Sequence, residues 1–82
     1  MQSRVAIMAI IVENTQAATP INALLHEYGR YIIGRMGLPY ARRNISLISV
    51  AIDAPQDVIS ALTGKIGNIP QVSVKTVYSK LE

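Results

Sequence analysis

The chain has 82 residues, half of which are hydrophobic, with a formal net charge of +3 and no cysteine. A chain of this length forms one domain, residues 1–82, and leaves no room for a second hydrophobic core. Without cysteine it has neither disulfides nor thiolate metal ligands, which is typical of a reducing compartment, and we expect a cytoplasmic protein.

The hydrophobic content is high for a small protein that exposes most of its surface. Either the chain enters a membrane, or it covers an apolar face by binding another subunit. The longest apolar run, Val5 to Val12, has eight residues, whereas a membrane-spanning helix needs roughly 20. The first residues also lack a signal-peptide cleavage site. We therefore expect no membrane segment and predict a homodimer or homotetramer.

The first predicted element is a strand over residues 4–12. Its apolar, mostly β-branched residues occupy both alternating positions, which is typical of a strand that is buried on both faces. The next three residues, Glu13, Asn14 and Thr15, favour turns and helix caps and end this strand.

A helix is predicted between Thr15 and Tyr28, because apolar residues recur at positions i, i+3, i+4 and i+7 and form one stripe. The stripe consists of Ile21, Leu24, Leu25 and Tyr28. Two starts are possible. The cap is either Asn14 or Thr15, or it is Thr19, which would place Pro20 in the first turn.

The end of this helix falls at Gly29, a natural C-terminal stop. His26, the only histidine, lies about 140° around the helix from Ile21. We therefore expect His26 to face solvent or a neighbouring subunit.

A weaker strand is predicted over Tyr31 to Leu38, where Gly34 and Gly37 interrupt the β-prone residues. Glycine inside a strand marks a bulge, a bend or the close approach of another chain. Pro39 ends this strand and belongs at an edge or in a loop. The polar connection that follows ends at Asn44, which tolerates a positive φ.

Residues 45–52 form the second strand that is apolar at both alternating positions. Asp53 and Pro55 then predict a helix start, with Asp53 as the cap and proline in the first turn. The helical stripe consists of Val58, Ala61, Leu62, Ile66 and Ile69. We expect the helix to end near Gly67, followed after Pro70 by a strand over residues 71–78 with one apolar and one mostly polar face.

The order of these elements is βαββαβ, which matches the ferredoxin-like α+β fold: a four-stranded antiparallel sheet with two helices on one face. This fold places strands one and three in the centre, and these are the two strands that are apolar at both alternating positions. Two helices cover one face of the sheet, so the other face would expose a patch too large for a monomer. This supports the prediction of a homo-oligomer.

The sequence also resembles a family of small proteins named as regulators of the iron-only hydrogenase system. The segments that carry the resemblance are residues 24–29, 34–40, 45–50, 61–70 and 72–76. The resemblance implies a ferredoxin-like domain, similar to ACT-type ligand-sensing domains and to the C-terminal domain of the nickel-responsive repressor. Glycine is usual in the family where Asn44 and Gln71 stand here. Asn44 keeps the turn possible, and Gln71 indicates that a positive φ is not essential at that position.

A metal site is not predicted. Nickel or zinc would need several ligands at one point. His26 would require a second chain together with Glu27, Glu13 or Asp53. We expect an exposed histidine and transfer no metal site from the nickel-responsive repressor, and we expect no cofactor.

The candidate contacts with a ligand or partner are His26, Arg35, Tyr40, Arg42 and Arg43. With Tyr31, the arginines and Tyr40 would form a basic aromatic patch for a nucleotide, an acidic metabolite or RNA; the alternative is a solvated hairpin. Direct DNA binding is not expected, because no helix-turn-helix is predicted. Gly64 to Gly67 is not a phosphate loop, because it lies at a helix C-terminus, whose partial charge is negative.

No nucleophile with a partner base and no paired carboxylates occur at a fixed spacing, so we predict no enzyme and no catalytic residue. The first hypothesis is a non-enzymatic regulatory or sensory domain of an iron-only hydrogenase system that acts as a homo-oligomer and responds to a small-molecule effector or a protein partner. The alternative is a structural or adaptor subunit that binds a protein partner and has no small-molecule ligand.

Overall fold

The computed structural model describes residues 3–80, except for the side chain of Thr15. The strands and helices are, in order, β1 (Ser3–Val12), α1 (Ala18–Glu27), β2 (Ile32–Tyr40), β3 (Ile45–Pro55), α2 (Gln56–Gly67) and β4 (Val72–Tyr78). Short 3-10 turns occupy Thr15–Ala17, Gly29–Tyr31 and Ala41–Arg43. This order confirms the predicted βαββαβ arrangement.

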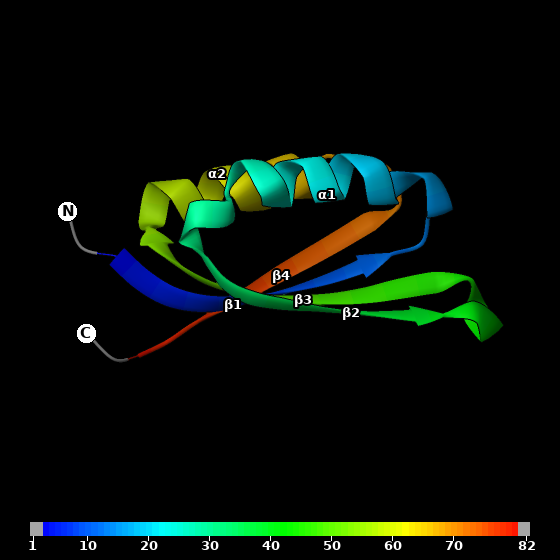
Figure 1. Cartoon of the computed structure of the whole chain (residues 1–82), viewed down its shortest axis with the longest axis horizontal. Helices are drawn as coiled ribbons and strands as arrows, with labels where there is room; N and C mark the ends of the chain where they lie inside the picture. Colours follow the sequence, from blue (N-terminus) through cyan, green and yellow to red (C-terminus); the bar gives the residue numbers. More distant parts are fainter. Residues whose placement is uncertain (1–2, 81–82) are drawn as a thin grey trace.

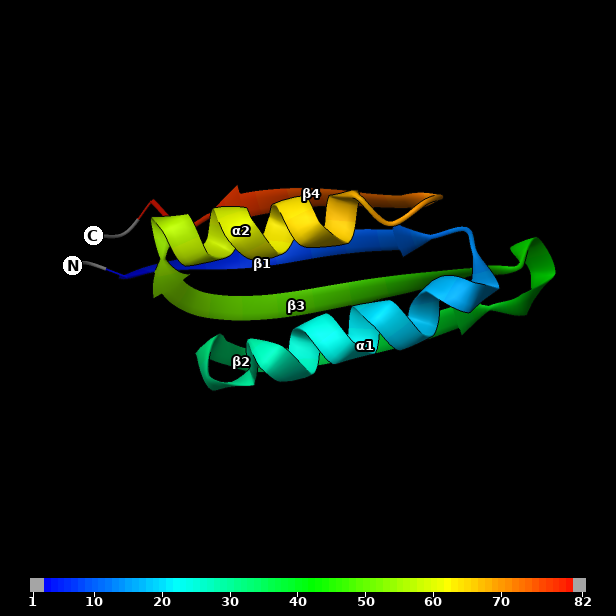
Figure 2. The same ribbon diagram turned by 90° about the horizontal axis from the view of Figure 1, so that it is seen from above.

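The strands form one antiparallel sheet in the order β2-β3-β1-β4. Both helices lie on the same face of this sheet, and the opposite face carries none (Figure 1). Viewed from above, α1 lies on the β2 side of the sheet and α2 on the β4 side (Figure 2). The ferredoxin-like α+β fold and the central position of β1 and β3 are therefore confirmed.

The core lies between the helices and the sheet. It takes alternate residues from the central strands and one stripe from each helix. Its largest members are Met8, Ile10, Ile21, Val50, Ile52, Ile59, Leu62 and Ile66. Burying each such side chain stabilises the fold by about 1.5–3 kcal/mol. The sequence stripe of α2 omitted Ile59 and included Ala61, but Ile59 is buried and Ala61 is exposed.

The prediction that β1 is buried on both faces is wrong for the single chain. Its even-numbered residues from Ala6 to Val12 are buried beneath the helices, whereas Val5, Ile7 and Ile11 are exposed. The helices cover only one face of the sheet, so apolar residues at both alternating positions cannot all be buried within one chain.

Neither predicted alternative supplies the cap of α1, which begins at Ala18 after Ala17 and has no side-chain cap. Asn14 Oδ1 accepts a hydrogen bond of 3.0 Å from the backbone N–H of Gln16 and so caps the 3-10 turn that leads into the helix. Pro20 lies in the first turn of α1, where its missing N–H costs nothing. Gly29 follows the helix end as predicted, but its φ is not positive, so it is not a left-handed cap.

Three other local predictions are corrected. Asp53 does not cap α2, because β3 extends to Pro55 and Asp53 pairs with Val5 in the sheet. Gln71 has a φ of 64°, so a positive φ is required there after all, as it is at Asn44 with 55°. Pro39 lies within β2 rather than after it, which is tolerated because β2 is an edge strand.

None of the helices within residues 3–80 is long and apolar enough to cross a membrane.

Candidate functional site

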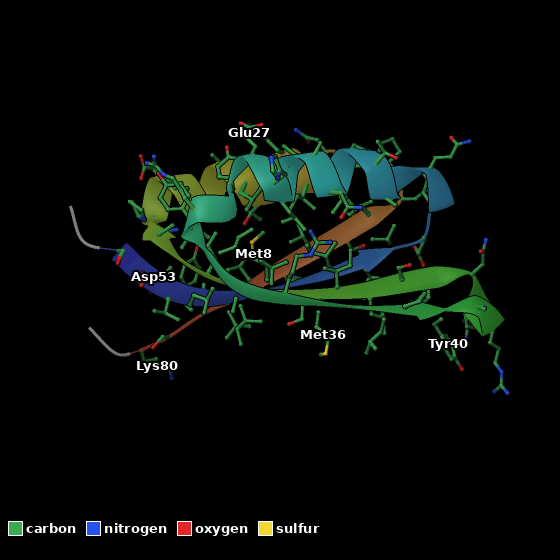
Figure 3. All side chains as sticks on the ribbon, viewed as in Figure 1. Met8, Glu27, Met36, Tyr40, Asp53 and Lys80 are labelled. Carbon is green, nitrogen blue, oxygen red and sulfur yellow. The ribbon has the colours of Figure 1, made fainter. Side chains whose placement is uncertain are left out.

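The face of the sheet opposite the helices, called the open face from here on, is apolar and uncovered in the single chain. Its large exposed side chains are Val5, Ile7, Ile11, Met36, Leu38, Tyr40, Leu47 and Val77. Met36 is 59% exposed and Val77 is 69% exposed. Figure 3 shows Met36 and Tyr40 directed away from the helices. A contiguous apolar surface of this kind is typical of an interaction site.

The strand register explains how this face forms. Ile7 of β1 lies opposite Ala51 of β3 and Val77 of β4, and cross-strand neighbours point to the same side of a sheet. The charged side chains of this face lie towards its borders: Lys75 is on the edge strand β4, opposite Ala9, and Asp53 lies towards one end of β3, opposite Val5.

A bulge in β2 decides which of its residues reach the open face. Ile32 pairs with Ile52 on the helix side, but the next paired residue is Gly34, so the register shifts by one. Without this shift, regular alternation from Ile32 would point Met36 and Leu38 into the core. The bulge instead sends them to the open face and turns Arg35 and Gly37 towards the helices. The bulge lies directly before Gly34, one of the two glycines at which an irregularity was predicted, whereas Gly37 pairs regularly with Ile48.

The helix side of the sheet contains a groove of about 610 Å³ between the start of α1 and the end of the β2–β3 hairpin. We call it the hairpin groove. The tip of the hairpin extends past the start of α1 (Figure 2). Residues that line it from this side include Val12, Asn14, Ala18, Asn22, Arg35, Gly37, Pro39, Asn44, Ser46 and Ile48.

The groove exists because small residues face each other across it. β2 presents Gly37, and a Cβ atom added there would meet no heavy atom within 4 Å. α1 presents Ala18 and the short side chain of Asn22. This part of the space between helix and sheet is therefore not filled by core side chains.

Arg35 is the charged residue among those that line the hairpin groove. Its Nη2 donates a hydrogen bond of 2.7 Å to Oδ1 of Asn22. The ion pair found within residues 3–80 joins Lys65 to Glu27 instead. Arg35 is therefore oriented by a neutral amide and keeps its positive charge uncompensated.

The structure brings together two of the five predicted contact residues. Arg35 and Tyr40 both line the hairpin groove, although the ring of Tyr40 is directed to the open face (Figure 3). His26 is exposed near the end of α1, and Arg42 and Arg43 are exposed in the turn after β2; all three lie outside the groove lining. Their contact with a ligand or partner stays a prediction.

The sequence reasoning missed Asn22, Gly37 and Ser46 as groove residues. Asn22 lies off the apolar stripe of α1, and only its position relative to β2 reveals a role. Tyr31, which was expected near the arginines of the hairpin, instead lies against Arg30, whose guanidinium carbon is 4.8 Å from the ring centroid.

A second polar cluster connects the two helices. Lys65 Nζ of α2 donates a 2.8 Å hydrogen bond to the hydroxyl of Tyr28 and lies 3.8 Å from Oε2 of Glu27. The Tyr28 hydroxyl, with a smaller contribution from Glu27, raises the pKa of Lys65 above its ordinary value of 10.5. Within residues 3–80, no three histidine, aspartate or glutamate side chains are grouped so that they could hold a metal ion.

Comparisons with known proteins place the chain in a family. Residues 4–76 match the TM1266-like family, described as "Iron-only hydrogenase system regulator, putative". The structure of the uncharacterized protein TM1266 from Thermotoga maritima is similar with a TM-score of 0.92 and 36% sequence identity, over 96% of this chain and 100% of that one.

A more distant similarity concerns the fold alone. A formyltetrahydrofolate deformylase from Pseudomonas putida KT2440 has a TM-score of 0.66 at 11% identity, over 89% of this chain and 28% of that enzyme. A comparison with functionally curated proteins gives no match. On the family match and the 36% identity to TM1266, the chain belongs to the TM1266-like family.

Proposed function

We propose that this protein is a non-enzymatic regulatory domain that acts as a homo-oligomer, in which the open face of one copy packs against the open face of another. The observation that carries the proposal is the apolar open face, which no element of the described chain covers. The family description supports the regulatory role and its link to an iron-only hydrogenase system.

The size of the open face suits a dimer. Four strands spaced about 4.8 Å apart and about eight residues long cover roughly 19 by 27 Å, or on the order of 500 Å² in projection. The relief of the side chains increases the accessible area above this value. Each partner contributes about 800 Å² to a standard protein interface. Covering the whole face with a second sheet therefore buries an area of the right order.

The pattern of large and small residues supports a second copy rather than a different protein. Along one row across the sheet, Val77 and Ile7 are bulky, whereas Ala51 and Gly34 are small. A twofold axis parallel to the strands between β1 and β3 would place Ile7 on Ala51 of the second copy and Val77 on Gly34. Such a self-complementary surface is what an isologous dimer requires.

The test of assembly is sedimentation velocity of the unmodified protein over micromolar concentrations, where a dimer has twice the 8.9 kDa mass of the chain. A tetramer that retains the same sheet-to-sheet contact is also consistent with the proposal. A chain that remains monomeric at high micromolar concentration would overturn it. Stoichiometric binding of a different protein by such a monomer would favour the adaptor alternative.

The regulatory part is tested separately, by deleting the gene in a host that carries an iron-only hydrogenase. The proposal predicts a change in hydrogenase transcript level or activity that the intact gene restores. Unchanged hydrogenase transcript level and activity would contradict the proposed regulatory role, but would not bear on the proposed homo-oligomer.

A further inference from the structure

We infer that the hairpin groove is a binding site for a small carboxylate with an apolar body, whose carboxylate is held by the guanidinium of Arg35. The binding itself is independent of the oligomer. Its meaning as a regulatory signal rests on the proposed function.

The volume and walls of the groove suit a small molecule. Ligand sites in proteins usually have volumes of about 300–1,000 Å³ and are mainly apolar, with a few polar groups that orient the ligand. The hairpin groove has about 610 Å³, and Val12, Pro39 and Ile48 provide apolar walls. Asn14, Asn44 and Ser46 add neutral polar groups at its border.

The charge of the groove favours an anion. No aspartate or glutamate is among its lining residues, and Arg35 is the only charged one. α1 also begins beside the groove, at Ala18, without an acidic residue in its first turn, so the partial positive charge of the helix start is not neutralised there. A single guanidinium fits one carboxylate, since its planar N–H groups pair with both oxygens.

Arg35 also differs from the other arginines and lysines that have side-chain contacts. Arg4 lies over the ring of Tyr78, 4.2 Å from its centroid, and donates to Gln56. Arg30 lies over Tyr31, and Lys65 contacts Tyr28 and Glu27. Arg35 is oriented at the groove through one Nη2 contact with Asn22, which leaves its other N–H groups able to bind a carboxylate.

β2 links the groove to the proposed dimer surface. Because of the bulge, Arg35, Gly37 and Pro39 face the groove, whereas Gly34 and Met36 belong to the open face alone. Leu38 faces the open side by its register and also borders the groove. A ligand that packs on one side of this edge strand therefore acts on the strand that presents the dimer contacts on its other side.

The test uses 4-phenylbutyrate as the probe in an NMR titration of the ¹⁵N-labelled full chain, with 4-phenylbutanamide as the uncharged control and phenyl phosphate as the second anion. We expect saturable shifts of the Gly37 amide and the Arg35 Nε–H with the carboxylate, and weaker binding of the other two compounds. Arg35→Gln should weaken binding at least about tenfold. Arg35→Lys should weaken it less, because lysine retains the positive charge, but it should still weaken it, because lysine lacks the planar pair of N–H donors that bind both carboxylate oxygens.

Three further variants test whether binding requires the groove itself, rather than the net charge of the protein or its assembly into a dimer. Arg42→Gln removes the same charge from a residue outside the groove lining and should leave the affinity unchanged. Gly37→Val fills the groove and should abolish binding while the dimer remains. Gly34→Val adds the same side chain to the open face, so it should weaken the dimer but leave the affinity for 4-phenylbutyrate unchanged.

The inference is overturned if the amide binds as tightly as the carboxylate, if Arg35→Gln and Arg42→Gln weaken binding equally, or if folded Gly37→Val binds like the unmodified chain. Probe binding by a chain that is always monomeric would reject the proposed dimer alone. A stable dimer that gives no saturable shifts would reject the binding site alone.

Discussion

Replacing Met36 by lysine puts a charge into the open face and tests the proposed interface at one position. Met36 is 59% exposed in the single chain. Burying a whole methionine side chain contributes about 1.5–3 kcal/mol, so covering the exposed part contributes about 1–2 kcal/mol per copy. A twofold interface contains this position twice. The change therefore removes about 2–4 kcal/mol, which weakens the dimer roughly 30- to 1,000-fold.

The sign of the introduced charge adds a second readout. The proposed twofold axis places position 36 opposite Lys75 of the second copy, because both residues lie in the row of Ala9 and Ser49. Met36→Lys should therefore disrupt the dimer more than Met36→Glu, whose carboxylate can pair with that lysine.

The assay is sedimentation velocity over a concentration series, with Ala61→Lys as the matched control because Ala61 is exposed on α2, away from the open face. Far-UV circular dichroism and urea unfolding confirm that each variant is folded. The reasoning is refuted if Met36→Lys and Ala61→Lys give the same dissociation constant as the unmodified chain.

Three further predictions concern the fold itself. Gln71→Gly should raise the free energy of unfolding by about 0.5–1 kcal/mol in urea titrations, since glycine accepts the φ of 64° without strain. Ile59→Ala should lower it by about 2–5 kcal/mol, since Ile59 is 0% exposed in the core; a loss comparable to that of an exposed residue would contradict the packing. The raised pKa of Lys65 means that its contact with Tyr28 stabilises the folded state below pH 10.5 and that this contribution is lost as the pH rises through the higher folded value. The difference in thermal stability between the unmodified chain and Lys65→Met should therefore shrink as the pH rises above 10.5, and a difference that stays constant as the pH rises would refute it.

The order of the elements and the identity of the central strands could be predicted, because each depends on a residue pattern within a single helix or strand. The stripe of Ile21, Leu24, Leu25 and Tyr28 marked one helix, and the alternation of Val72 to Tyr78 marked the last strand. Asn44 has the positive φ that its residue type favours. Each of these signals lies within one element and requires no knowledge of its neighbours.

The incorrect role of Asp53 and the missed groove both depend on pairing between distant residues. Asp53 looked like a helix cap, but its pairing with Val5 extends β3 by several residues. The hairpin groove depends on the bulge after Ile32, which reverses the sides that Arg35 and Met36 face. Simple alternation along β2 would have placed Met36 in the core, so the sequence alone did not reveal that Arg35 and Asn22 meet.

β1 has apolar residues on both of its faces, but the single chain buries only one of these faces. Ala6 and Met8 are buried, but Ile7 between them is 53% exposed. A second sheet across the open face would account for both sets of residues, because it would cover the side that the helices leave free.

The most direct measurement is an isotope-filtered NOESY spectrum of a mixture of ¹³C-labelled and unlabelled chains. It detects only contacts between copies and requires no substitution. The proposed interface predicts intermolecular contacts between the methyl groups of Ile7 and the methyl group of Ala51. An oligomer whose intermolecular contacts involve exposed helix residues such as Ala61, with none from Ile7, would contradict the proposal that the open faces pack together.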